Sequence, residues 1–181
     1  TQFCSKAQAL SLNSNRSLLE SGKHSDVVFS VEFVDEQDNK QIKDFPLHKA
    51  ILSGRSSVFA TMFDANDFVE VQQNRVLITD IKLEVFEALI RYLYWSDIGQ
   101  VEEFSADLFA IADKYNLGEL KQFTEQLLRS KIAEDNAVDL LVLANMHNAQ
   151  QLKSFASDYI KQKFSSISKT DKWSALVREQ T

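Results

Sequence analysis

Three histidines are the side chains best suited to acid–base or metal chemistry, and they are scattered along the chain. His24, His48 and His147 fall in separate predicted elements, without the helical spacing by which histidines bind zinc. Ser25, Asp26 and His48 include the side-chain types of a nucleophilic triad. Ser25 lies beside a predicted strand, however, without the strained turn that exposes such a nucleophile. We therefore expect no catalytic residues, no metal ligands and no bound cofactor.

The sequence also lacks the glycine-rich motifs of nucleotide-binding and hydrolytic enzymes. It has four glycines in 181 residues, and no G-x-G-x-x-G, phosphate-binding loop or G-x-S-x-G elbow occurs among them. The chain is therefore not expected to be an enzyme. We expect its function to reside in its surfaces.

Composition excludes further classes of partner. A formal net charge of −6 and a pI of about 5.1 argue against nucleic-acid binding, which depends on clustered Lys and Arg. No apolar run approaches the roughly 20 residues of a membrane-spanning helix. The single cysteine, Cys4, fits a reducing compartment, and we expect nuclear or cytoplasmic localisation. Because the chain opens Thr-Gln-Phe-Cys without an initiator Met, we expect it to be part of a longer protein.

The first half of the chain predicts a mixture of helices and strands. Residues 26–35 are rich in β-branched and aromatic side chains and predict a strand, residues 36–40 a hairpin loop, and residues 41–45 the returning strand. Short helices are expected over 48–52 and 58–63, a strand over 75–79, and a longer helix over 83–95. Before them, four leucines share one side of a predicted N-terminal helix that ends at Ser21-Gly22-Lys23: Leu10, Leu12, Leu18 and Leu19.

The second half contains a weak internal repeat with an offset of 32 residues. Residues 112–116 (ADKYN) followed by 120–123 (LKQF) resemble 144–148 (ANMHN) followed by 152–155 (LKSF). A helix is expected before and after each copy, so each unit is interpreted as a helical hairpin that buries its apolar stripe on its neighbour. The alternative, that helical hairpins look alike without being related, remains open.

Several segments resemble the BTB/POZ domain. The strand His24 to Phe29 (HSDVVF) is followed, within Phe45 to Phe63, by the pattern H-K-x-x-L-x-x-x-S-x-x-F. Asn74-Arg75-Val76 and residues 112–115 (ADKY) continue the resemblance, which spans about Lys23 to Ile132. Among its subfamilies the chain is most similar to the MATH-BTB proteins, although Glu32 to Gln41 makes a longer first hairpin than is usual there.

This resemblance implies an α+β fold, in which a short β-sheet is flanked by a helical cluster and a three-box or BACK-type helical extension follows. The implied boundaries are residues 1–22 for an N-terminal dimerisation helix and linker, 23–132 for the BTB/POZ domain, and 133–181 for the start of the extension. The resemblance also implies a homodimer. The expected interface residues are Leu10, Leu12, Leu18, Leu19, Asp26, Lys49 and Ile51, with Asp26 and Lys49 as an ion pair.

A cullin-binding surface is implied as well. Cullin-binding members carry a hydrophobic-x-Glu motif in the loop before a short strand, and Phe68-Val69-Glu70 fits that position. Asp113 matches a second cullin-facing position. These residues suggest a homodimeric substrate adaptor that binds the N-terminal domain of cullin-3, with protein substrates captured by an upstream domain outside this chain.

Two other BTB functions compete with this one. A transcriptional repressor would use the dimer to recruit a corepressor, but such proteins usually continue into zinc fingers, and no C-x-x-C pair occurs in this chain. A tetramerising channel-type assembly module is disfavoured by the long helices expected after Ile132.

Overall fold

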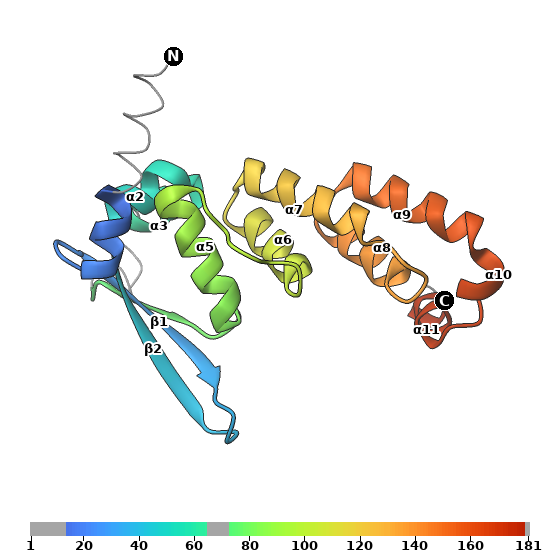
Figure 1. Ribbon diagram of the computed structural model, residues 1–181, viewed down its shortest axis with the longest axis horizontal. Helices are drawn as coiled ribbons and strands as arrows, with labels where there is room; N and C mark the ends of the chain where they lie inside the picture. The colour runs from blue at the N-terminus through green and yellow to red at the C-terminus, as the bar shows by residue number, and fades with distance from the viewer. Residues whose placement is uncertain (1–13, 65–72, 180–181) are drawn as a thin grey trace, which may run out of the picture. The chain divides into compact units, whose positions relative to one another are not determined.

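The computed structural model describes residues 14–64 and 73–179, and these fall into two compact units (Figure 1). The first unit contains the described residues up to Val101 together with Lys114–Leu117. The second contains Glu102–Asp113 and the residues from Gly118 onward.

The first unit combines a three-stranded sheet with helices. After a helical segment at 14–21 come β1 (Val27–Val34), β2 (Lys40–Leu47), α2 (Lys49–Arg55), α3 (Ser57–Asp64), β3 (Arg75–Ile78) and α5 (Leu83–Trp95). The sheet order is β2-β1-β3, with β1 antiparallel to β2 and parallel to β3. These elements agree with the helices and strands expected from periodicity.

One face of β1 forms the centre of the first unit's core. Val27, Phe29 and Val31 alternate along the strand and are buried, as a half-covered strand requires. The ring of Phe29 lies 5.8 Å from that of Phe59 on α3 and 5.8 Å from that of Phe86 on α5. The sheet is thereby fixed to its helices by aromatic packing.

The returning strand is longer than the sequence predicted. It continues past Phe45 through Pro46, which pairs with Val28. Proline lacks an N–H and is tolerated where no hydrogen bond is needed, and β2 is an edge strand with a neighbour on one side only. Gly22 ends the preceding helix with φ +61°, and a Cβ there would lie 3.0 Å from Cγ of Pro46, so the residue is required at this turn.

The second unit is a row of helices, α6 (Ser105–Lys114), α7 (Gly118–Ser130), α8 (Ala137–Met146), α9 (Gln150–Gln162), α10 (Phe164–Ile167) and α11 (Asp171–Glu179). The bounds of α6 and α7 reappear in α8 and α9 after 32 residues. The buried residues of α7, Leu120, Thr124 and Leu128, correspond by the same offset to Leu152, Ala156 and Ile160 in α9. The internal repeat expected from the sequence is therefore present in the structure.

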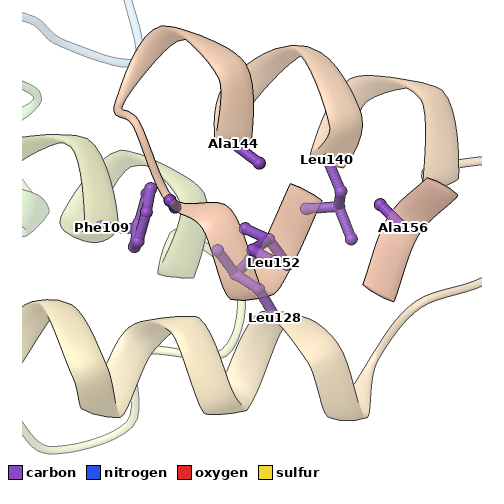
Figure 2. Close-up of a cluster of buried hydrophobic side chains, with 7 residues drawn as sticks. Phe109, Leu128, Leu140, Ala144, Leu152 and Ala156 are labelled. Carbon is purple, nitrogen blue, oxygen red and sulfur yellow. The ribbon is translucent and has the colours of Figure 1, made fainter. Parts of the chain in front are cut away.

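A shared apolar core joins the two hairpins. Figure 2 shows side chains from α6, α7, α8 and α9 converging on one cluster, whose buried members are Phe109, Leu128, Leu140, Ala144, Ala149, Leu152 and Ala156. A second cluster extends the stack toward α11, where Trp173 and Leu176 pack against buried residues that include Ile160. Each fully buried Leu contributes roughly 1.5–3 kcal/mol, so α8 and α9 form one packed body with α6 and α7.

Candidate interaction surfaces

The helical segment 14–21 lies against α5 of its own chain. Nδ2 of Asn15 donates to the carbonyl oxygen of Tyr94 at 3.0 Å, and the guanidinium of Arg16 lies 5.8 Å from the ring centroid of Trp95. Leu19 lines a small cavity of about 230 Å³ with side chains that include Phe45 and Ile90. One side of this predicted dimerisation helix is thus occupied by its own domain.

Two other residues predicted for the dimer interface keep apolar surface open to solvent. Leu18 on the N-terminal helix and Ile51 on α2 are each only partly buried in the single chain. Leu10 and Leu12 lie outside the described residues. The described part of the predicted interface therefore includes Leu18, Leu19 and Ile51, which are all partly buried.

The predicted ion pair between Asp26 and Lys49 is wrong in its partners. Oδ1 of Asp26 accepts a hydrogen bond from the main-chain N–H of Lys49 at 2.8 Å, which satisfies a free donor at the start of α2. The ammonium of Lys49 instead donates to Oδ1 of Asn74 at 2.5 Å and lies 5.7 Å from the ring centroid of Phe63. Asp26 therefore caps the start of α2. The unpaired main-chain N–H of Lys49, rather than its ammonium, is the group that bonds the Asp26 carboxylate.

His48 is a structural residue, bonded at both ring nitrogens. Nδ1 lies 2.8 Å from the hydroxyl of Tyr94, Nε2 lies 2.8 Å from the carbonyl oxygen of Lys23, and the Tyr94 oxygen accepts the main-chain N–H of His48. The consistent assignment has Nε2–H donating to the carbonyl and the tyrosine hydroxyl donating to Nδ1. Burial raises the pKa of Tyr94, so its hydroxyl keeps the proton this network needs. Both ring nitrogens of His48 are therefore bonded to Tyr94 and Lys23 rather than to Ser25 or Asp26.

Asp113, predicted to face the cullin, is the centre of a charged network in the second unit. Oδ1 lies 2.5 Å from the ammonium of Lys121 on α7, and Oδ2 lies 2.8 Å from Nδ1 of His147 after α8. Burial alone would raise the pKa of Asp113, but hydrogen bonds and charge from Lys121 and His147 outweigh it and hold this pKa below its usual range. About a third of the Asp113 side chain stays exposed.

Lys121 connects the first hairpin with the second. Its ammonium also donates to the main-chain oxygen of His147 at 2.9 Å and lies 5.5 Å from the ring centroid of Phe109, while His147 packs edge-on against the same ring. Sequence reasoning missed Lys121 and His147 as partners of Asp113. The repeat held a signal for Lys121 only, because a polar residue and a lysine recur eight residues apart as Asn145 and Lys153, which are bonded at 2.7 Å in the structure.

The remaining predicted site residues lie outside the described part of the chain. Phe68, Val69 and Glu70, the predicted cullin-binding motif, fall within 65–72, where the structure describes nothing. Among residues 14–64 and 73–179, no group of three or more His, Cys, Asp or Glu side chains is placed to hold a metal ion. In the same residues, no helix is long and apolar enough to cross a membrane.

Comparison with known proteins identifies the domain. The family model for the BTB/POZ domain matches residues 15–132. The chain belongs to the BTB/POZ family. The solved BTB domain of zebrafish PATZ1 is similar at a TM-score of 0.57 and 21% sequence identity, over 70% of this chain and 95% of that one. At this identity the likeness concerns the fold alone, and it agrees with the predicted α+β architecture.

A BTB domain is a protein-interaction module that commonly forms homodimers. The family assignment therefore confirms the coarse expectation that this chain works through its surfaces. The helices α8 to α11 lie beyond the matched residues, and α8 and α9 share a buried core with α6 and α7 of the matched part.

Proposed function

We propose that this chain is a homodimeric substrate adaptor of a cullin-3 RING ubiquitin ligase, of the MATH-BTB type. The observation that carries the proposal is the packing of the extension. The second hairpin, α8–α9, shares one buried core with α6–α7 and is tied to Asp113 through His147. An extension of this kind enlarges the surface on which the resemblance places the cullin.

The surface chemistry supports the same proposal. The chain is acidic, and Asp113 holds a carboxylate at the junction of the two hairpins. Phe68, two residues before Glu70 in the sequence, is the proposed aromatic anchor, and buried aromatic anchors dominate the energetics of protein interfaces. The mechanism is proximity. The dimer holds cullin and substrate together and raises their effective concentration without performing chemistry.

Calorimetry with the full chain and a purified cullin-3 N-terminal domain tests the proposal. Wild-type chain binds, and Phe68→Ala weakens binding by about 2–4 kcal/mol, the range typical of an interface hot spot. This corresponds to roughly 30- to 1000-fold in Kd. Phe164→Ala is the control, because it removes a phenylalanine ring that is 50% exposed on α10, and it leaves Kd unchanged.

Two other outcomes point elsewhere. If wild-type chain does not bind the cullin domain, the adaptor function is lost and the corepressor-recruiting BTB dimer becomes the better hypothesis. If it binds but ignores Phe68→Ala, the adaptor function stands and this anchor is wrong.

A further inference from the structure

A polar cleft of about 440 Å³ lies between α7 and the start of α9 in the second unit. Eight of the nine side chains that line it are polar or charged, and Ala149 is the exception. The polar lining consists of Lys121, Gln122, Glu125, Gln126, Arg129, Asn148, Gln150 and Gln151. Five of these carry a side-chain amide, which both donates and accepts hydrogen bonds.

The two cations of the cleft are already held by other groups. Lys121 donates to Asp113 at 2.5 Å and to the main-chain oxygen of His147. The guanidinium of Arg129 lies 4.8 Å from the ring centroid of Phe155, a favourable cation–π distance. Neither cation pairs with the carboxylate of this cleft.

That carboxylate belongs to Glu125, and one of its two oxygens has no hydrogen-bond partner. Its Oε1 atom is shielded from solvent and accepts no hydrogen bond from the described residues. Glu125 lies four residues from both Lys121 and Arg129, the helical spacing at which ion pairs form, yet both cations bind other groups. A buried acceptor without a donor costs free energy. The cleft therefore contains one unmatched carboxylate oxygen among adaptable amides.

We propose that this cleft binds an arginine side chain of a partner protein, with Glu125 as the acceptor. A guanidinium presents a planar fork of donors that matches both oxygens of a carboxylate. The terminal torsion of a glutamate is soft, so the shielded oxygen turns toward such a fork at little cost. The surrounding Gln and Asn amides then pair with the main chain on either side of the arginine. This site does not depend on cullin binding.

The test uses the isotope-labelled full chain and a minimal probe, Nα-acetyl-arginine-N-methylamide, followed through the side-chain amide resonances of the cleft. The probe shifts the signals of Gln122, Gln126 and Gln150, and Glu125→Gln weakens its binding at least about tenfold, as expected for one charge-assisted hydrogen bond. The matched control is Glu119→Gln in the first turn of the same helix, which leaves binding unchanged. The neutral citrulline analogue does not bind.

Thermal unfolding of the same variants gives an independent measurement. Glu125→Gln raises the unfolding midpoint, because a shielded carboxylate oxygen without a donor costs more free energy than an amide group at the same place. A lower midpoint would mean that Glu125 pairs with its own cations in solution and would overturn the proposal. Probe binding that ignores Glu125→Gln would overturn it too, as would equal binding of the acetyl-lysine-N-methylamide analogue, which lacks the forked donor.

Discussion

The ammonium of Lys121 lies 2.5 Å from Oδ1 of Asp113, and the same contact recurs one repeat later between Lys153 and Asn145 at 2.7 Å. The two contacts connect equivalent positions of two helical hairpins 32 residues apart. In the first hairpin the acceptor is a carboxylate, and Lys121 also reaches the main-chain oxygen of His147. The first copy therefore also ties the hairpins to each other, whereas the second acts within one hairpin.

This difference predicts unequal effects on stability. Lys121→Met and Asp113→Asn each lower the free energy of unfolding by about 1–2 kcal/mol, because a partly buried, charge-assisted contact is lost and solvent screens part of it. Lys153→Met lowers it by less, since its acceptor is neutral and its site is exposed. Urea unfolding of the three variants at neutral pH measures the difference. Equal losses for Lys121 and Lys153 would contradict the bridging role.

The lowered pKa of Asp113 predicts a loss of stability in acid. A carboxyl group with a folded-state pKa below its unfolded value stabilises the fold above the unfolded pKa. That contribution disappears as pH falls through the folded pKa. Other groups, such as Asp44 with its hydrogen bond from Arg75, follow the same trend. Unfolding free energies measured from pH 7 down to pH 3 should therefore decline less for Asp113→Asn than for wild type. If the free energies of unfolding of wild type and Asp113→Asn fall in parallel with pH, Asp113 does not contribute to the acid sensitivity.

The fold was predictable because hydrophobic periodicity is a local property. The β-branched and aromatic residues of 26–35 predicted a strand, and the structure buries Val27, Phe29 and Val31 on one face of it. The 32-residue repeat predicted two helical hairpins, and both are present. The returning strand was predicted too short at both ends, as 41–45 against Lys40–Leu47, since the sequence does not say that β2 lies at a sheet edge, where Pro46 is tolerated.

Side-chain partners were less predictable, because they are chosen by tertiary geometry. Asp26 and Lys49 have opposite charges, yet the Asp26 carboxylate accepts a hydrogen bond from the main-chain N–H of Lys49 and not from its ammonium. Asp113 was singled out by resemblance alone. Its partner His147 is 34 residues away, and only the packing of α8 against α6 brings the two together. The predicted cullin-binding motif falls within residues 65–72, outside the described part of the chain, so its role stays a prediction.

Dimerisation is expected to depend on the apolar surface that the single chain leaves open. Leu18→Glu and Ile51→Glu should each convert a homodimer into a folded monomer, because burying a few such side chains at roughly 1.5–3 kcal/mol each can support micromolar affinity. Light scattering measures the mass, and circular dichroism checks the fold. The control is Leu77→Glu, because Leu77 is 52% exposed on β3. A wild-type monomer would contradict the prediction.

The last prediction concerns how Asp113 contributes to cullin binding. Its carboxylate is bonded to Lys121 and His147, so we expect it to act mainly by positioning the α8–α9 hairpin. Lys121→Met should then weaken cullin binding as much as Asp113→Asn does. Each of the two substitutions should weaken cullin binding by about 1 kcal/mol, which corresponds to roughly fivefold in Kd. Both effects should therefore be far smaller than that of Phe68→Ala.

A direct contact predicts a different pattern for the same two variants. The exposed third of the Asp113 side chain would then meet the cullin, and Lys121→Met would leave affinity unchanged or improve it, since the carboxylate would be released from a competing cation. Calorimetry with the cullin-3 N-terminal domain separates the two, with Lys153→Met as a variant that removes a lysine contact within one hairpin only. Equal weakening by Lys121→Met and Asp113→Asn, with Lys153→Met neutral, supports positioning. Weakening by Asp113→Asn alone would assign Asp113 to the interface itself.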